Sequence, residues 1–416
     1  MADKKQILFV HQNFPGQFKN LAPALIKEGY DVHAIGYQPN VSQVKPHTGL
    51  TLHMYSISKG TSEDIEPLAA EFETKMIRGK ATADKCEELK NSGLNPRLII
   101  SHPQWGETFF LKDVWPETKI LSYFEMHWRM EDSDIDFDKE FFNEELKRFT
   151  SRKIRPRNAF NEIIYRDSDK IMTPTEYQKS TAPDYLKKDI EVVHDGIDTN
   201  VLIPSNKGEF NIGEKIKLTK NDKIISFINR NLEPQRGYHI FMRSLPKVLK
   251  ENPDAHILII GSNNKGYGLP APDGQSWKEI FYNEVKDKID ETRVHFLGRV
   301  DYKTLIGIYQ LTTLHVYLTY PFVLSWSVLE AMSCESLVLG SNTAPVSEVI
   351  TNKKNGLLVD FFDIDKLSDT MNDVLKNPKK FDKIRKNARN TIKSKYDLKT
   401  KSLPMQIKII NEMLDK

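Results

Sequence analysis

Short apolar runs alternate with longer mixed segments along the first half of the chain. The run ILFV at 7–10 is followed by segment 16–30, which ends in Gly-Tyr, and then by the apolar run 31–37. This order predicts a strand, a helix and a second strand. A long polar helix is expected at about 62–91. Further strands are expected at 97–101, 119–123, 170–173 and 191–194. Strands that alternate with helices indicate a parallel sheet covered by helices.

The same alternation restarts after a segment rich in Gly, Asn, Asp and Pro, which is typical of a linker. The strands expected beyond it are 223–228, 256–261, 294–298, 314–318, 336–340 and 355–360. We therefore expect an α/β protein with two doubly wound, Rossmann-like domains and a cleft between them. The predicted ranges are 1–195, a linker at 196–215, 216–395, and a helix at 396–416 that packs back toward the first domain. Ligands of such sheets bind at the carboxyl ends of the strands.

The composition indicates the cellular compartment in which the protein is expected. No apolar run approaches the roughly 18 residues that a membrane span requires, and the short apolar stretch near the N-terminus reads as a strand rather than a signal peptide. The two cysteines, Cys86 and Cys334, are far apart and lack metal-ligand spacing. This usage favours a reducing compartment, so a cytoplasmic protein is expected. The net charge of +3 decides little.

Several segments carry a resemblance to a known family. They are HQNFPGQFKNLAPAL at 11–25, HDGIDTNVLIP at 194–204, NRNLEPQRG at 229–237, VHFLGRV at 294–300 and SVLEAMSCESLVLGSNTAPVSEVITNKKNGLLVD at 327–360. Across nearly its whole length the chain resembles a GT-B glycosyltransferase of family 4. The first segment, together with HPQWGETFFLKDVWPETKILSYFE at 102–125, resembles one subgroup. The resemblance implies two Rossmann-like domains, a retaining transfer, a nucleotide-sugar donor and neither a catalytic metal nor a cofactor.

One carboxylate, Glu330, interrupts the apolar stretch YPFVLSWSVLEAMSC at 320–334. A buried carboxylate must be hydrogen-bonded or neutral, because its desolvation is costly. The resemblance implies that Glu330 accepts hydrogen bonds from the ribose of the nucleotide. The simpler alternative is an acid favoured by a helix dipole. The resemblance also implies donor contacts from Gly298 and Arg299.

The chain departs from the family pattern at Phe322, where a second acid near the sugar is usual. Backbone amides around Leu324 and Ser325, or the Ser325 hydroxyl, are expected to contact the sugar instead. The departure leaves the identity of the sugar open and keeps the nucleotide site.

Arg230 and Arg236 follow the first strand of the second half. Negative charge grows on a diphosphate as it leaves, and guanidinium groups can stabilise it without a metal. The alternative is a pair of solvated surface arginines. Gly16, in the first strand–helix turn, would let the backbone approach the donor, near a helix N-terminus that favours anions. Alternatively it is a simple turn glycine.

Polar and aromatic residues follow two strands of the first half. His102, Trp105 and Glu107 come after 97–101, and Glu125 and His127 come after 119–123. A transferase must position an acceptor hydroxyl and handle its proton. His102 and Glu125 are the catalytic candidates, and the resemblance favours Glu125 over His127. Trp105 and Glu107 are candidates for binding the acceptor, although a Trp is more often part of a core.

The sequence KRFTSRKIRPR at 147–157 concentrates positive charge. Lys147, Arg152, Lys153 and Arg155 are candidates for binding an anionic acceptor, and Arg157 suits a structural role. Anionic lipid headgroups, with peripheral membrane attachment, fit such a cluster. A nucleic-acid backbone fits it equally, and a solvated helix face is the ordinary alternative.

Three functions follow from these patterns. The leading one is transfer of a hexose from a UDP- or GDP-sugar to a hydroxyl of a glycan or lipid-linked acceptor. The second keeps that donor and makes hydroxymethylated DNA the acceptor. The third is a nucleotide-sugar-binding protein without transfer activity, against which the retained charges of Glu330, Arg230 and Arg236 argue.

Overall fold

A computed structural model describes residues 5–205, 207–272 and 274–415. The described chain divides into two units, each with its own sheet. The first unit contains the residues up to 130, 142–196 and those from 399 onward, and the second contains 131–141 and 197–398. Segment 131–141, which the sequence pattern assigned to the first domain, therefore belongs to the second unit. No helix in the described ranges is both long and apolar enough to cross a membrane.

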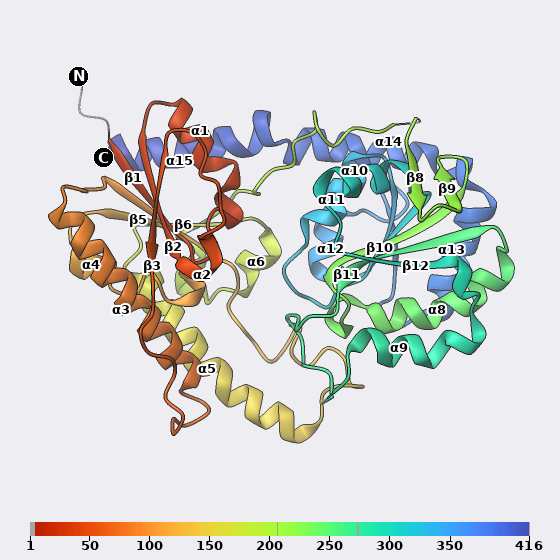
Figure 1. Cartoon of the computed structure of the whole chain (residues 1–416), viewed down its shortest axis with the longest axis horizontal. Coiled ribbons are helices and arrows are strands. Elements are labelled where there is room, and N and C mark those ends of the chain that lie inside the picture. Colours follow the sequence, from red (N-terminus) through yellow and green to blue (C-terminus); the bar gives the residue numbers. More distant parts are fainter. Residues whose placement is uncertain (1–4, 206, 273, 416) are drawn as a thin grey trace. The chain divides into compact units, whose positions relative to one another are not determined.

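The first unit is built on seven parallel strands in the order β3-β2-β1-β4-β5-β6-β7 (Figure 1). The strands are β1 (Gln6–Val10), β2 (Asp31–Tyr37), β3 (Leu50–Tyr55), β4 (Leu98–Ser101), β5 (Lys119–Tyr123), β6 (Lys170–Thr173) and β7 (Ile190–Val192). Its helices are α1 (Leu21–Lys27), α2 (Gln38–Val41), α3 (Ala70–Asn91), α4 (Leu111–Val114), α5 (Glu144–Arg166), α6 (Glu176–Thr181), α7 (Asp184–Lys187) and α15 (Leu403–Asp415). Strand order reverses between β1 and β4. In doubly wound sheets, ligands bind at the carboxyl ends of the strands beside such a reversal.

Both faces of the central strand β1 are buried, which explains why its sequence is continuously apolar. Ile7 and Phe9 belong to the core that includes α1 and α15, and Leu8 and Val10 belong to the core that includes α3 and α4. The C-terminal helix α15 lies beside α1 (Figure 1). It is tied there by a hydrogen bond from Tyr30 Oη to Asn411 Oδ1 (2.7 Å).

The second unit repeats this plan with six parallel strands in the order β12-β11-β10-β13-β14-β15. They are β10 (Lys223–Asn231), β11 (Ala255–Ser262), β12 (Val294–Gly298), β13 (Leu314–Tyr317), β14 (Leu337–Ser341) and β15 (Leu357–Val359). The helices are α8 (Tyr238–Glu251), α9 (Trp277–Val285), α10 (Tyr302–Leu311), α11 (Trp326–Ser333), α12 (Ala344–Val349), α13 (Ile364–Lys376) and α14 (Asp382–Thr391). Here the order reverses between β10 and β13. Alternate residues of β10 again enter two cores, one with α8 and α13 and one with α10, α11 and α14.

The structure corrects several predicted elements. Helix α3 begins at Ala70 and not near residue 62, after a turn at Pro67, since proline disfavours helix in the residue before it. The single helix expected from Gly16 is a 3₁₀ turn (Gly16–Lys19) followed by the short α1. The pattern missed β3, an edge strand whose Thr51 and His53 interrupt the apolar run.

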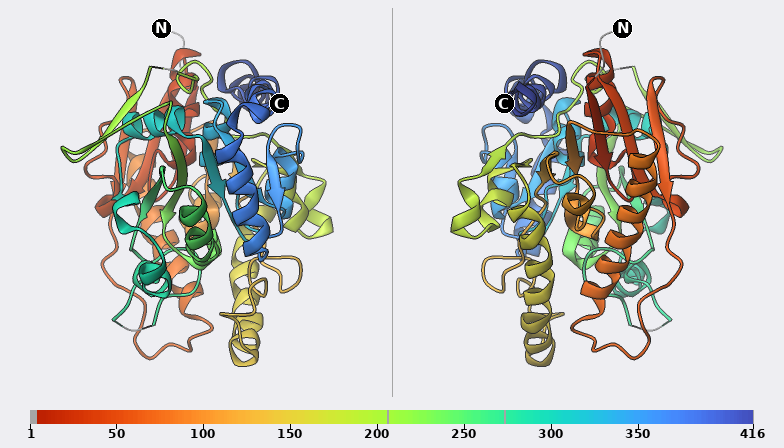
Figure 2. Two further views of the ribbon diagram at one scale, coloured as in Figure 1. Left: turned by 90° about the vertical axis from the view of Figure 1, so that its right-hand side faces the viewer. Right: turned by 90° about the vertical axis from the view of Figure 1, so that its left-hand side faces the viewer.

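The predicted linker is also more ordered than expected. It contains β8 (Glu209–Ile212), which pairs antiparallel with β9 (Ile216–Thr219), and its residue 206 lies outside the described residues. Figure 2 shows this two-stranded sheet standing apart from the six-stranded one.

Segment 131–141 is fixed to the second unit by polar and aromatic contacts. Asp138 Oδ2 accepts hydrogen bonds from Tyr320 Oη (2.8 Å) and lies 3.0 Å from His239 Nε2. Arg243 contacts both carboxylate oxygens of Glu140 at 2.7 Å. Phe137 packs against Tyr320 with ring centroids 5.1 Å apart. These partners are distant in sequence and belong to the second unit, which explains why the segment is part of that unit.

Candidate functional site

In the second unit, the carboxyl ends of β10 and β13 meet at a buried cation. Arg236 closes a 3₁₀ turn (Pro234–Arg236) after β10, and its side chain is only 7% exposed. Its Nη1 donates to Thr319 Oγ1 (2.9 Å), to the Val323 carbonyl (3.0 Å) and to Tyr317 Oη (3.2 Å). These acceptors come from the end of β13 and the loop after it, so Arg236 joins the two strands at the reversal point.

The charge of Arg236 is not neutralised by the described residues. All of its hydrogen-bond acceptors are neutral oxygens, and none of the described carboxylates forms an ion pair with it. The next residue, Gly237, has φ +69° and directly precedes the 14-residue helix α8. A Cβ there would lie 2.3 Å from Leu318 Cβ, which explains the glycine. A buried guanidinium beside a helix N-terminus is suited to bind an anion.

Glu330 lies on α11 and is 6% exposed. Tyr302 Oη donates to its Oε1 at 2.9 Å, and Tyr309 Oη lies 3.4 Å from its Oε2. Two tyrosine hydroxyls therefore stabilise the carboxylate inside the apolar stretch. The polar environment that a buried acid requires is present, and its role toward a ribose stays a prediction.

Gly298 and Arg299 line a hollow of about 420 Å³ at the ends of three neighbouring strands. Leu232 follows β10, Ser262 ends β11, and Phe296 belongs to β12. Gly298 has φ +64°, so the chain turns where β12 ends. Arg299 is exposed. The structure therefore brings these two predicted donor residues to one cavity at the ligand-binding edge.

Several of the groups predicted to contact the sugar already form contacts within the protein. The Ser325 amide donates to Tyr317 Oη (2.9 Å), and Ser325 Oγ caps α11 by accepting from the Ser327 amide (3.3 Å). Leu324 belongs to the apolar core with α11. Phe322 is buried, and Arg236 lies over its ring at 5.2 Å. Arg230, by contrast, is exposed on β10.

In the first unit, His102 and Glu125 come together where β4 and β5 end. His102 is fully buried, and its Nε2 lies 2.8 Å from Glu125 Oε2. The imidazole is stacked against Trp105 (centroids 4.5 Å, 24°) and Tyr123 (5.1 Å, 22°). Glu125 is partly exposed. The pair can therefore offer one carboxylate oxygen to a bound group while the histidine fixes its orientation.

The sequence pattern missed His11, which directly follows β1. Its ring lies 5.2 Å from His102 and 5.0 Å from Trp105, and its Nε2 is 2.8 Å from Gln17 Oε1. Burial, followed by the nearby His102, lowers the pKa of His11 to about 3. A signal existed, because His11 and His102 each come at the carboxyl end of an adjacent strand. A Cβ on Gly16 would lie 2.4 Å from His11 Nε2, so Gly16 (φ +46°) accommodates this ring.

Glu107 is placed in the interior rather than at the exposed edge. It is fully buried and accepts a hydrogen bond from Tyr55 Oη (2.6 Å). Burial raises the pKa of its carboxyl above the ordinary value. This position corrects the expectation that Glu107 is open to an acceptor. His127 contacts Glu162 at 3.1 Å, which fits a structural role.

The basic cluster occupies the N-terminal half of α5, a helix that extends beyond the seven-stranded sheet in both views of Figure 2. Arg152 and Arg155 are exposed, Lys153 lies 6.0 Å from the Phe149 ring, and Lys147 lies 3.9 Å from Glu144. Arg157 instead donates to Glu71 at 2.6–2.9 Å and lies over Trp128. The helix therefore separates a solvent-facing set of cations from one structural arginine.

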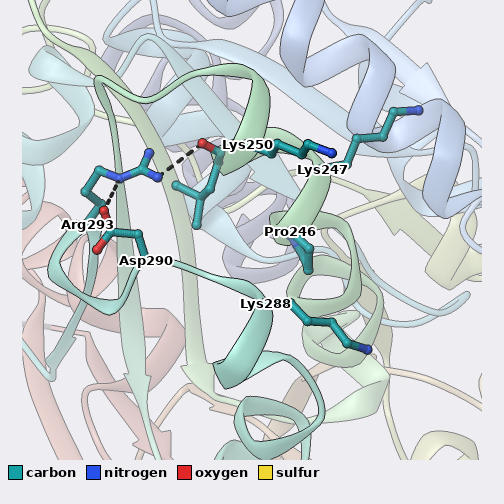
Figure 3. Close-up of a pocket in the computed structure, with 7 residues that line it drawn as sticks. Pro246, Lys247, Lys250, Lys288, Asp290 and Arg293 are labelled. Atoms are coloured by element: carbon teal, nitrogen blue, oxygen red, sulfur yellow. Dashed lines mark hydrogen bonds and ion pairs between the residues drawn. The ribbon is translucent and has the colours of Figure 1, made fainter.

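A second basic hollow, of about 510 Å³, lies elsewhere on the second unit (Figure 3). Lys247, Lys250 and Lys288 line it, and Arg293 is turned toward Asp290 and the Leu249 carbonyl. Its residues end α8 or precede β12, so they lie at the amino ends of the strands. This is the edge opposite to the one where doubly wound sheets bind ligands.

One group of described residues has ligand-type atoms within metal-binding range. Atoms of Asp138, Glu140 and His239 lie within 4.8 Å of one another. Asp138 bridges His239 and Tyr320, and Glu140 is engaged by Arg243. The contacts of Asp138 and Glu140 with neighbouring side chains fix segment 131–141.

Two family models match the chain, one for each unit. The model "Glycosyl transferase family 4 group" matches residues 28–202, and "Glycosyl transferases group 1" matches residues 209–391. The chain belongs to the GT-B glycosyltransferases of the family 4 type. The N-terminal motif that suggested one subgroup remains a prediction.

Curated relatives of this glycosyltransferase are distant. Spore coat protein SA of Bacillus subtilis (strain 168) is 24% identical over 248 residues, which are 57% of this chain and 64% of the relative. The GDP-mannose-dependent monoacylated alpha-(1-6)-phosphatidylinositol monomannoside mannosyltransferase of Corynebacterium glutamicum is 25% identical over 174 residues, which are 40% of this chain and 41% of the relative. The matched regions thus span less than two thirds of either relative.

Solved structures share the fold over nearly the whole glycosyltransferase. Sucrose-phosphate synthase from Thermosynechococcus elongatus superposes with a TM-score of 0.75 at 15% identity, covering 99% of this chain and 100% of that one. Anabaena HepE in complex with UDP-glucose gives a TM-score of 0.66 at 15% identity, covering 98% and 99%. At such identity the likeness establishes the two-domain, Rossmann-like GT-B fold.

Proposed function

We propose that this glycosyltransferase is a retaining, metal-independent enzyme that moves a hexose from a UDP- or GDP-sugar to a hydroxyl of a glycan or lipid-linked acceptor. The observation that carries the proposal is Arg236, a buried cation with only neutral protein contacts at the strand-reversal point. A diphosphate would supply the opposite charge that the described residues do not. Glu330 would accept hydrogen bonds from the ribose, and the hollow at Gly298 would receive the base.

Nucleotide sugars are also named for proteins similar to this one. HepE was crystallised with UDP-glucose, and the Corynebacterium relative is named as GDP-mannose-dependent. These names support a nucleotide-sugar donor and leave the choice between uridine and guanosine to experiment.

On the acceptor side, the first unit would supply Glu125, oriented by His102. The bond between the anomeric carbon and the diphosphate oxygen breaks, and a bond to the acceptor oxygen forms on the same face of the sugar, so the anomeric configuration is retained. The acceptor's proton passes to the Glu125 carboxylate. Positive charge from Arg236 stabilises the departing diphosphate as its negative charge grows, which lowers the barrier more than it strengthens donor binding. Arg230 would assist from its exposed position.

The test is a panel of UDP- and GDP-sugars, with nucleotide release followed for the full chain. We expect release from at least one donor, faster with a glycan or lipid-linked acceptor, and unchanged by EDTA. Donor binding without turnover would favour the non-catalytic alternative, and stimulation by DNA carrying hydroxymethylated bases would favour the DNA alternative. Failure of the chain to bind UDP and GDP, with or without sugar, would contradict the proposal.

A further inference from the structure

A loop between β11 and α9 places an aromatic side chain against both candidate phosphate-binding arginines. Tyr267 Oη accepts a hydrogen bond from Arg230 Nη1 at 3.3 Å, and the Arg230 guanidinium lies 6.0 Å from the Tyr267 ring. The Arg236 guanidinium lies 5.7 Å from the same ring. Tyr267 and Phe322 are neighbours, with ring centroids 5.3 Å apart and planes inclined at 50°. Two aromatic rings and two cations thus form one cluster.

The position of this loop is fixed by a residue that precedes Arg236. Glu233 is buried, and its Oε2 accepts a hydrogen bond from the Gly268 amide at 2.9 Å. A Cβ on Gly266 would lie 2.0 Å from the same oxygen, so only glycine allows this approach. Asn231 Nδ2 also lies 3.4 Å from the Lys265 carbonyl. Tyr267 is held between these contacts, so its proximity to Arg236 is a consequence of the local fold.

The chemistry of this cluster differs from that of a hydroxyl-binding site. Arg236 is already placed over the Phe322 ring at 5.2 Å, and cations are attracted to aromatic faces. A donor sugar is bonded directly to the distal phosphate, so rings that touch both phosphate-binding arginines would lie beside the sugar. Aromatic faces offer contact area to C–H and methyl groups but leave a facing hydroxyl without a hydrogen bond. Phe322 stands where the family resemblance implies a carboxylate, which would bind hydroxyls.

We propose that Tyr267 and Phe322 form an aromatic wall of the donor-sugar subsite, which selects sugars that present an apolar substituent. The inference rests on the proposed function, because it assumes a nucleotide diphosphate on Arg230 and Arg236. The substituent is a deoxy carbon or the methyl group of an acetamido substituent. Tyr267 is 51% exposed, so its ring has surface that a bound sugar can cover.

Calorimetry on the full chain can separate the sugar from the nucleotide. UDP and GDP are compared with two donor pairs, UDP-glucose against UDP-N-acetylglucosamine and GDP-mannose against GDP-6-deoxymannose. The wild-type protein should bind the acetamido or the 6-deoxy member more tightly, and which pair responds identifies the substituent. Tyr267→Ala should weaken that donor roughly three- to tenfold and change the affinity for the free diphosphate by less than about twofold. Phe322→Glu should shift preference toward the hydroxylated member.

The control is Leu269→Ala in the same loop. Leu269 is 37% exposed, and its hydrogen bond from Trp277 Nε1 is accepted by the backbone carbonyl, which alanine keeps, so the variant should match the wild type. Equal losses for diphosphate and nucleotide sugar in Tyr267→Ala, or a Leu269→Ala loss of the same size, would overturn the aromatic wall alone. A wild-type protein that distinguishes neither pair would also overturn it. Absence of all diphosphate binding would overturn the proposed function as well.

Discussion

At the scale of single residues, Arg236 and Glu330 show two ways of keeping a charge inside a protein. The Glu330 carboxylate accepts from one tyrosine hydroxyl and lies near a second, whereas Arg236 donates to three neutral oxygens. The hydrogen-bond acceptors of Arg236 among the described residues are all uncharged. Buried charge is costly without a partner, and under the proposed function a bound diphosphate would supply the opposite charge for Arg236.

Replacing Glu330 tests the ribose contact. Glu330→Gln keeps the shape of the side chain and removes its charge, so nucleotide affinity should fall about tenfold or more, the value of one charge-assisted hydrogen bond. Calorimetry with UDP and GDP measures the change. The exposed carboxylate of Glu214 provides the control, because Glu214→Gln should have no effect. Unaltered affinity in a folded Glu330→Gln protein would remove Glu330 from the site.

Replacing Arg236 tests the role of charge in the reaction. Arg236→Ala should lower kcat about a hundredfold or more while changing the donor KM much less, because the diphosphate charge grows in the transition state. Steady-state kinetics at saturating acceptor give both constants. Arg385 is the matched arginine, half-buried and with structural contacts to Asp382 and backbone carbonyls. Arg385→Ala should lower stability and spare kcat. A wild-type kcat in Arg236→Ala would contradict the assignment.

At the scale of elements, the carboxyl ends of strands decide which side chains meet. β1 and β4 bring His11 and His102 together, and β10 and β13 bring Arg236 and Tyr317 together. The residues are far apart in sequence, and His11 and His102 are recognisable as the residues that directly follow an apolar run. Helix α5 is different. Its positive charge is evident from the sequence, but packing against Glu71 and Trp128 decides that Arg157 has a structural role.

The role of Arg152, Lys153 and Arg155 on α5 can be tested by the salt dependence of the acceptor KM. If the acceptor is anionic, its KM should rise steeply with ionic strength, because counterions released on binding drive association. Replacing Arg152, Lys153 and Arg155 by Ser should flatten this dependence and leave donor hydrolysis unchanged. The same substitutions at Lys247, Lys250 and Lys288 are the control, since those lysines line the hollow at the opposite edge of the strands. If the acceptor KM of both triple variants depends on ionic strength as it does in the wild type, the cations of α5 are a solvated helix face with no part in acceptor binding.

At the scale of the whole molecule, buried neutral histidines link folding to pH. Burial lowers the pKa of His194 to about 4 and that of His315 to about 3, while an unfolded histidine titrates near 6.5. Between these values the unfolded chain binds more protons than the folded one. Stability is therefore fully present above pH 6.5 and falls as the pH drops toward 4, by at most about 1.4 kcal/mol per pH unit for each histidine.

Urea unfolding between pH 7 and 4 measures this loss. His315 contacts Ser226 Oγ at 2.9 Å, and His315→Gln should flatten the pH dependence of the second unit's transition whatever its effect on stability at pH 7. The exposed His47 gives the comparison, because His47→Gln should leave the slope unchanged. Identical slopes in all three proteins would show that buried histidines do not control acid stability.

The sequence alone determined the fold class and most strands, because apolar runs between helical segments are a local signal and parallel sheets bury both faces of their central strands. It also pointed to Arg236, Glu330, His102 and Glu125, which follow those strands or interrupt an apolar stretch. It could not place the half-exposed edge strand β3, whose pattern is mixed, or segment 131–141, which is fixed by Tyr320, His239 and Arg243.

Only the tertiary structure decided which partner each functional residue has. It buried Glu107 against Tyr55, left Arg152 exposed and brought His11 to His102. It also brought Tyr267 to Phe322 and two arginines, although nothing in the loop sequence marks that tyrosine. Such contacts depend on the three-dimensional positions of strand ends and on glycines that permit close approach. A one-dimensional pattern of apolar and polar residues records neither.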